Sequence, residues 1–263
     1  MEQTQTEDRI DSTNKRKITG ILFILFLIGI ASCTVFKAAP IAPTSFLQHG
    51  AEMQHLPEEF PFDSVWIADK EKLSILCMRF SRLILSPVQS NLAEEKIRDL
   101  DFASDILKDR IEELHEMARY IEVRFESEIN DIIGRPIQIV EAPVPDTLGI
   151  ELALIEVRPR NTAISIVGTV GGILVPFGGV VRLFGKGSIA IEGKIKDAYT
   201  QELLFEFKDR EIDKTAPFSI KDFQRYAHIR EVIDEWSKDF GKLIATNFKQ
   251  KIPEGVPVTI DPF

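Results

Sequence analysis

The amino-acid sequence predicts an α+β fold, in which an antiparallel sheet with a β-hairpin packs against two long amphipathic helices. Two apolar stripes predict the helices, because apolar residues recur every three or four positions before residue 133 and again between residues 219 and 250. Alternating apolar and charged residues around 189–207 predict the hairpin. This order of strands and helices is typical of an α+β domain and differs from the strict alternation of a doubly wound sheet.

The first elements are expected between residues 65 and 133. Residues 65–67 and 73–85 are apolar enough to be strands. Ser86-Pro87-Val88-Gln89 then resembles a capped helix start, with Ser at the cap and Pro in the first helical position. The helix that follows is either one long helix or two helices broken near Asp101. Its apolar stripe consists of Leu100, Ala103, Leu107, Ile111, Leu114, Ala118, Ile121 and Phe125.

Further strands are expected after Gly134 and Pro136, which end this helix. Residues 137–140 and 148–157 alternate in the manner of strands. A hairpin follows, in which residues 197–201 form the turn, and its two faces are predicted to be one apolar and one charged. The apolar face contains Ile189, Ile191, Ile195, Leu203, Phe205 and Phe207, and the charged face contains Glu192, Lys194 and Lys196.

The second long helix is expected over residues 219–250. Ser219 with Asp222 imitates a capping box at its start, and Pro253 and Pro257 follow its end. Its apolar stripe consists of Phe223, Ala227, Val232, Trp236, Phe240 and Leu243.

The amino end has the pattern of an export signal. Lys15, Arg16 and Lys17 precede an apolar run over residues 21–31, and Ser32-Cys33 ends it. Basic residues, a short apolar stretch and small residues occur in this order in secretory signals. The run is shorter than the roughly 20 residues that span a bilayer.

Residues 30–33, Ile-Ala-Ser-Cys, resemble the lipobox of bacterial lipoproteins. That resemblance implies a diacylglycerol on the Cys33 thiol and cleavage just before it. Thr34 is not the aspartate associated with inner-membrane retention, so the outer membrane is the expected destination. Ile30 stands where the family usually has leucine, and the preceding polar region is long. An uncleaved amino-terminal anchor helix with an incidental cysteine is the alternative.

Three regions are therefore predicted: a signal peptide over 1–32, a lipidated cysteine and tether over 33–62, and a single periplasmic α+β domain over 63–263. Four prolines in the tether, Pro40, Pro43, Pro57 and Pro61, forbid a continuous helix there. The signal peptide holds four positive and four negative residues, so the formal charge of -9 stays with the exported chain. Cys77 lies between Leu76 and Met78, a setting that predicts a buried, inert thiol.

Composition excludes several classes of protein. The 263 residues are 44% hydrophobic and include two cysteines, which argues against disorder and against a disulfide-stapled miniprotein. Lys and Arg number 32 against 41 Asp and Glu, so no basic surface is expected for nucleic acid.

A Gly-rich apolar segment lies within residues 161–187. Residues 161–181 contain no charged side chain and are long enough to cross a membrane, but five glycines and Pro176 weaken any helix. Three interpretations stay open: a loop or hairpin packed on the protein or on lipid, a segment that inserts only in an oligomer, and a monomeric spanning helix.

Motifs for catalysis, cofactors and metals give no defensible site. Residues 185–190 match a dinucleotide fingerprint, but a strand is predicted to follow them where that motif needs a helix. His49 and His55 bracket Glu52 in a proline-rich segment that cannot fix metal geometry. His115 lacks a second histidine at zinc-protease spacing. No cofactor, metal or catalytic residue is predicted, and the protein is predicted not to be an enzyme.

Several motifs of the mature chain resemble a family of bacterial lipoproteins known as domain of unknown function 3313. They are Ser45-Phe46-Leu47, residues 187–192 (Gly-Ser-Ile-Ala-Ile-Glu), residues 197–203 (Asp-Ala-Tyr-Thr-Gln-Glu-Leu), and Ile233-Asp-Glu-Trp236 with Phe240 and Leu243. The hairpin departs from the family in one respect, because Gln201 stands where a glycine is expected. The resemblance implies an envelope lipoprotein without established catalytic residues.

The expected function is that of an outer-membrane lipoprotein whose non-catalytic periplasmic domain binds an envelope protein or a second copy of itself. Lipidation at Cys33 is the one predicted site, and the membrane, through this anchor, is the first predicted partner. No nucleic-acid partner is expected. An oligomeric, membrane-inserting secretion or assembly subunit and an envelope enzyme are the alternatives.

Overall fold

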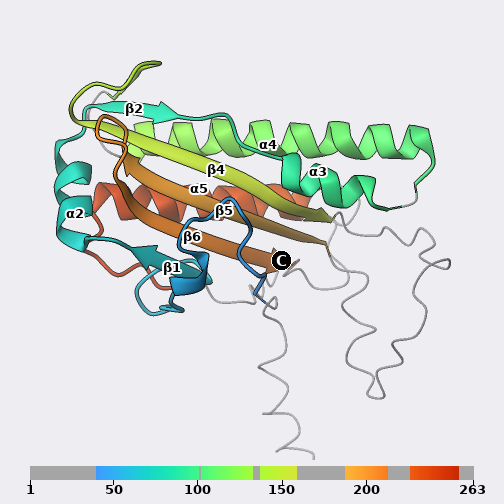
Figure 1. The fold of residues 1–263 in the computed structure, drawn as a ribbon, viewed down its shortest axis with the longest axis horizontal. Coiled ribbons are helices and arrows are strands. Elements are labelled where there is room, and N and C mark those ends of the chain that lie inside the picture. Colours follow the sequence, from blue (N-terminus) through green and yellow to red (C-terminus); the bar gives the residue numbers. More distant parts are fainter. Residues whose placement is uncertain (1–39, 101, 133–136, 159–186, 213–225, 255–263) are drawn as a thin grey trace, which may run out of the picture. The chain divides into compact units, whose positions relative to one another are not determined.

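A six-stranded mixed sheet organises the domain (Figure 1). The computed structural model describes residues 40–100, 102–132, 137–158, 187–212 and 226–254, all within one unit, residues 38–263. The strands lie in the order β1-β6-β5-β4-β2-β3. Their bounds are Ser64–Ile67 for β1, Arg82–Leu85 for β2, Gln138–Ile139 for β3, Thr147–Arg158 for β4, Ser188–Asp197 for β5 and Leu203–Ile212 for β6.

The α+β class is confirmed, but the prediction of an antiparallel sheet is wrong. Strands β1, β6, β5 and β4 are antiparallel neighbours, whereas β2 pairs in parallel with both β4 and β3. The reason is the long connection after β2, which passes through two helices before β3 and β4. A crossover of this length lets the chain return to the same end of the sheet, so the strands that it joins run in parallel.

Four α-helices are described, whereas two long helices were expected, the first of them either single or broken near Asp101. They are α2 (Lys70–Arg79), α3 (Asn91–Arg98), α4 (Ser104–Ile132) and α5 (Ala227–Ala245). The two short ones replace parts of the predicted pattern, while α4 and α5 are the two long helices. Among the described residues, none of the helices combines the length and the apolar composition that a membrane span requires.

The prediction of strands over residues 73–85 is wrong for its first half, which is helix α2. Asp69 caps this helix, because its side chain accepts hydrogen bonds from the backbone N–H groups of Glu71 and Lys72 at 2.9 and 3.0 Å. Leu73, Leu76 and Cys77 face the core at helical spacing. A short apolar run does not distinguish a helix from a strand, and the Asp69 cap was the signal that did.

The predicted helix start at Ser86 is also wrong, because residues 86–89 run in parallel beside β4. Ser86 N–H donates to the Ile150 carbonyl and Gln89 N–H donates to the Leu152 carbonyl. These bonds give the segment a backbone partner outside a helix, so α3 begins only at Asn91. Of the two alternatives for this region, two helices rather than one are correct, with the break between Arg98 and Ser104.

Helix α5 and the hairpin match their predicted places. The described part of the second long helix runs over Ala227–Ala245, and its predicted cap at Ser219 lies outside the described residues. Strands β5 and β6 form the hairpin, with Ile195 opposite Phe205. In the turn, the Asp197 side chain accepts hydrogen bonds from the N–H groups of Tyr199 and Thr200. Gln201 has a φ of 62°, the left-handed conformation that glycine adopts without strain.

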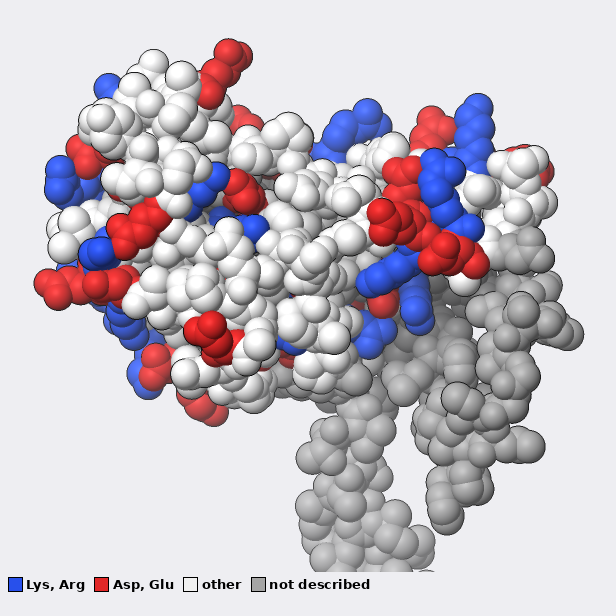
Figure 2. All heavy atoms as spheres, in the orientation of Figure 1, with Lys and Arg blue, Asp and Glu red and all other residues white. Residues whose placement is uncertain are grey.

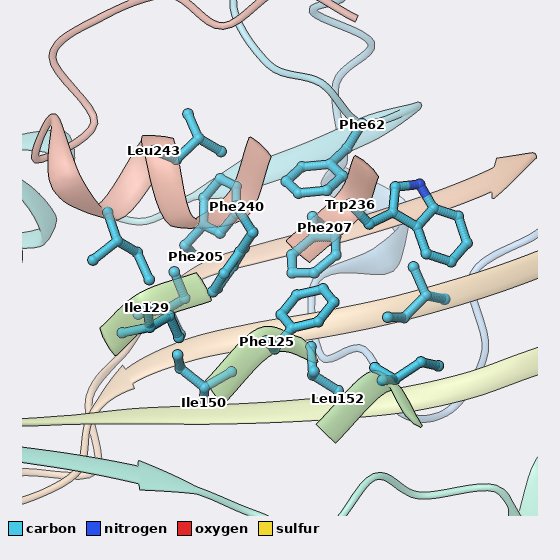
Figure 3. Close-up of a cluster of buried hydrophobic side chains, with 14 of the residues drawn as sticks. Phe62, Phe125, Ile129, Ile150, Leu152, Phe205, Phe207, Trp236, Phe240 and Leu243 are labelled. Atoms are coloured by element: carbon cyan, nitrogen blue, oxygen red, sulfur yellow. The ribbon is translucent and has the colours of Figure 1, made fainter. Parts of the chain in front are cut away.

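One face of the sheet, here called the inner face, packs against α4 and α5. Figure 3 shows rings from both layers meeting there. The Phe207 ring centroid lies 4.1 Å from that of Phe62 and 5.5 Å from that of Phe240, and Phe125 lies 5.2 Å from Phe240. All four side chains are fully buried. This aromatic core joins the sheet to both long helices.

Candidate functional site

The opposite, outer face of the sheet is covered by residues 40–54, here called the strap (Figure 1). Pro40 and Pro43 keep its first residues out of regular structure, and Gly50–Glu52 form a single 3-10 turn. Its end joins the sheet edge, where Gln54 and Val65 exchange two backbone hydrogen bonds of 2.8 and 2.9 Å. The strap therefore closes the free edge of β1 as well as covering the outer face.

Charged residues of β5 and β6 form the floor under the strap. In the hairpin register Glu192 stands opposite Lys208, and Lys194 stands opposite Glu206. Opposite charges thus face each other across the two strands, an arrangement that stabilises a strand pair. All four are nevertheless buried, with 0% exposure for both glutamates, 9% for Lys194 and 8% for Lys208.

The two glutamates hold the strap through its backbone. Glu192 accepts hydrogen bonds from the Thr44 N–H at 2.8 Å and the Thr44 hydroxyl at 2.5 Å. Glu206 accepts from two consecutive N–H groups, those of Gln48 and His49, both at 2.8 Å. Hydrogen bonds to an ionised acceptor are stronger than neutral ones, so these contacts are strong attachments of the strap.

The lysines make contacts of a different kind. The Lys208 ammonium donates to the Ile41 carbonyl, and the Lys194 nitrogen lies 4.2 Å from the centroid of the Phe46 ring. Burial raises the pKa of the Glu192 carboxyl, and the Thr44 bonds and the Lys208 charge oppose that shift only in part. The strap thus places its own donors, acceptors and an aromatic ring over charges that would otherwise face water.

A small apolar cluster and one ring stack complete the attachment. Phe46 and Leu47 of the strap pack on the outer-face residues Ala153, Ile155 and Ala190, apart from the main core. At the far end of the strap, the His49 ring stacks on Trp66 of β1 with centroids 3.6 Å apart. The His49 Nδ1 atom is 3.5 Å from Glu206 Oε2.

A second group of buried polar residues lies at the inner face. Asp209 of β6 accepts a hydrogen bond from the Trp236 indole at 2.5 Å and one from the Asp63 N–H at 3.0 Å. Burial, followed by the neighbouring Asp63 charge, raises the pKa of the Asp209 carboxyl well above its ordinary value. These contacts tie α5 and residue 63 to the sheet, which is a structural role.

The residues singled out from the sequence have different outcomes. Cys33 and residues 161–186 lie outside the described residues, so lipidation and the nature of the Gly-rich segment stay predictions. Cys77 is buried, as predicted, with 2% exposure. His49 stacks on Trp66, and His55 contacts the Asp63 carbonyl. Within the described ranges, no three His, Cys, Asp or Glu residues gather in a way that could hold a metal.

The strap and its acidic partners were missed by sequence reasoning. The hairpin pattern correctly separated an apolar face from a charged face, but it gave no sign that the strap covers the charged face. A usable signal was present, since residues 40–51 contain no charged side chain, unlike an ordinary solvated linker. Figure 2 shows the result, because the centre of this face is mostly uncharged and most of the charges lie toward its margins.

Comparisons with known proteins identify a family but no function. The family model described as "Protein of unknown function (DUF3313)" matches residues 81–240. No curated protein matches the chain.

Similar solved structures include a PelC dodecamer from Paraburkholderia phytofirmans, at 7% identity and a TM-score of 0.34, covering 65% of this chain and 90% of that one. A minor lipoprotein from Acinetobacter baumannii is 12% identical, with a TM-score of 0.32 and coverage of 66% and 98%. The hypothetical protein CT253 from Chlamydia trachomatis is 11% identical, with a TM-score of 0.28 and coverage of 65% and 92%. Similarities this weak transfer no function to this chain.

Proposed function

Since this chain belongs to the DUF3313 family, whose description names no activity, we propose from its own residues that it is a lipid-anchored envelope protein. In this proposal Cys33 carries the lipid and the domain faces the periplasm from the outer membrane. The domain acts by binding an envelope protein or a second copy of itself, and it is not an enzyme.

The attachment of the strap is the observation that carries the proposal. The chain that follows Cys33 is fastened to the sheet by two buried glutamates rather than left as a solvated linker. Seven peptide bonds separate Cys33 from Pro40. Two buried carboxylates thus bind residues that lie soon after Cys33. This firm attachment is suited to a protein that is anchored at its amino end.

The use of the buried polar residues supports a binding role over catalysis. Glu192 and Glu206 hold the strap, and Asp209 holds Trp236. Tyr226 donates to Glu113 between the two long helices. Each of these groups in the described residues joins two chain segments, which is the work of structural contacts.

Metabolic labelling with a palmitate analogue tests the anchor. The wild-type chain is expected to be labelled and Cys33→Ala is not, while Cys77→Ala, a buried cysteine, is a matched control that keeps the label. Equal labelling of wild type and Cys33→Ala contradicts the proposal. Intact mass spectrometry separates the alternative, because an uncleaved anchor helix keeps residues 1–32.

Photo-crosslinking in intact cells tests the binding role. The side chains of Met78 on α2 and Tyr199 in the hairpin turn are apolar and exposed, at 47% and 59%. A photoreactive residue at either place is expected to capture a specific partner or a second copy. The absence of any specific adduct at both places, with lipidation intact, would argue against these surfaces and the binding role.

A further inference from the structure

We propose that the strap sets both the distance and the orientation of the domain at the membrane. It holds the outer face of the sheet toward the lipid surface and the helix layer, α4 and α5, away from it. This inference rests on the proposed lipidation of Cys33, and its test is chosen so that the two can fail separately.

The first step concerns where the anchored chain leaves the domain. Lys208 of β6 holds the Ile41 carbonyl, and Pro40, the first described residue, is exposed. Lys208 belongs to the outer face, opposite Glu192. The chain that leads to Cys33 therefore departs from the outer face, on the side of the sheet opposite to the long helices.

The second step concerns reach. An extended chain from Cys33 to Pro40 spans at most about 25 Å, whereas a free tether to residue 62 would span about 100 Å. A helix is about 10 Å across and its axis lies about 10 Å from its packing partner, so the helix layer ends some 15 Å behind the sheet. Attachment of the strap thus reduces the greatest distance between Cys33 and the folded domain from about 100 Å to about 25 Å.

The third step concerns the surface that this orientation places at the lipid. The exposed residues of the first part of the strap are small or polar and uncharged: Pro40, Ala42, Pro43, Ser45, Gln48 and Ala51. The exposed side of α4 instead carries charges, including Lys108, Asp109, Glu112, Glu116 and Arg119. Charged groups cost less free energy in water than near a bilayer, and a domain with a net charge of -9 is repelled by anionic lipid. Residues 40–51 are therefore the part of the outer face that tolerates proximity to lipid, and exposed charges surround them at Glu52, at Arg158 and on α3.

Energy transfer to the bilayer tests the orientation with the full lipidated chain. A donor dye is attached to Ala51→Cys on the strap or to Val123→Cys on α4, both exposed positions, in a Cys77→Ala background. The probe is a vesicle of phosphatidylethanolamine and phosphatidylglycerol with acceptor-labelled headgroups. Because the two positions differ in depth by about 20 Å, transfer at Ala51→Cys is expected to be at least about twofold greater. Equal transfer, or greater transfer at Val123→Cys, overturns the inference.

Variants that weaken the hydrogen bonds of the strap test whether the strap causes the difference in energy transfer between the two dyes. Glu192→Ala with Glu206→Ala is expected to release the strap and remove the difference between the two dyes. Glu202→Ala, which changes an exposed acid in the hairpin turn, is the matched control and should preserve it. A flexible Gly/Ser insertion after Lys37, as long as the strap, leaves the folded residues untouched and is expected to abolish the difference as well. A difference that survives this insertion contradicts the distance-setting role.

Vesicle association distinguishes failure of the inference from failure of the proposed function. A chain that does not bind vesicles through Cys33 refutes the lipid anchor. A chain that binds them but shows no preference between the two dyes refutes the orientation alone.

Discussion

The two faces of the central sheet are built from opposite chemistry, yet both are buried. On the inner face, Phe207 of β6 meets Phe240 of α5, which in turn meets Phe125 of α4. On the outer face, Glu206 and Lys208 from the same strand meet the backbone of the strap. The alternation of a strand sends successive side chains to these two faces. The comparison shows that a charged face can be a packing surface when a segment supplies hydrogen bonds to it.

The two faces should differ in how their stability is lost. Apolar packing on the inner face depends on shape, so a truncation leaves a cavity. Attachment on the outer face depends on a few hydrogen bonds to ionised groups, so a truncation leaves donors without acceptors. Four principal substitutions follow in order of decreasing expected effect, and two of them are paired with a second variant for comparison.

Phe207→Ala is expected to have the largest effect, a loss of about 3–5 kcal/mol in the free energy of unfolding, because the ring is fully buried. Gly193 offers a matched second site, since a Cβ there would lie 2.1 Å from Phe207 Cε1. Gly193→Ala should therefore be destabilising alone and much less so in the Phe207→Ala background. Urea unfolding of the four chains in this double-mutant cycle measures the coupling, and strict additivity would contradict direct packing of ring on glycine.

Glu206→Ala addresses the outer face and is expected to cost about 2–3 kcal/mol, since two strap N–H groups lose an ionised acceptor. Hydrogen exchange should then accelerate at Gln48 and His49 while the strands beneath stay protected. Glu202→Ala is the control, because its ion pair with Lys72 is exposed and should contribute little. Uniform acceleration throughout the domain would show instead that the strap is part of the same cooperative unit as the core.

Asp209→Asn probes a buried carboxyl of the inner face, whose pKa burial raises well above its ordinary value. Burial raises this pKa above the ordinary 3.8, so the folded chain keeps a proton that the unfolded chain releases. The free energy of unfolding is therefore expected to fall as pH rises from about 4 toward the raised pKa, and Asp209→Asn should flatten this slope. Urea midpoints at a series of pH values measure it, with exposed Glu58→Gln as control. An unchanged slope in Asp209→Asn would assign the pH dependence to other groups.

Much of the fold could be predicted because it depends on local patterns. The buried stripe of α4 from Leu114 to Phe125, the apolar half of the hairpin and the place of α5 within 219–250 follow from periodicity. The predicted stripe was wrong at its start, because Leu100 and Ala103 precede α4 and are exposed. Residues 73–79 and 86–89 could not be assigned in this way. The first is a short apolar run whose helical state depends on the Asp69 cap, and the second is extended because β4 supplies its hydrogen bonds.

The candidate site was harder to predict because its contacts are distant in sequence. Thr44 and Glu192 are 148 positions apart, and Gln48 and Glu206 are 158 apart. No periodicity in either segment reports such a pairing. The family motif Ser45-Phe46-Leu47 was visible, but only the structure shows that Phe46 and Leu47 are buried on the outer face. The absence of charge in residues 40–51 was the physical clue, since it marks a segment that is not solvated on all sides.

Gln201→Gly is expected to have the smallest effect, and it tests the turn that joins β5 to β6 and sets their register. Gln201 has a φ of 62°, a conformation that glycine adopts without the steric cost that a Cβ incurs. The substitution should stabilise the domain by about 0.5–1 kcal/mol, reduced by the loss of the Gln201 side-chain hydrogen bond to the Ala198 carbonyl.

Phe248→Gly provides the opposing case, with a similar φ of 56° but a ring buried against Phe205. At Phe248 the packing lost with the ring exceeds the backbone strain that glycine relieves. Phe248→Gly should therefore destabilise the domain. Thermal unfolding of the two variants decides between backbone and packing effects. If Gln201→Gly also destabilises the domain, the side-chain contacts of Gln201 stabilise the turn. In that case glycine, the residue expected in the family at this position, could not replace Gln201 in this chain without a loss of stability.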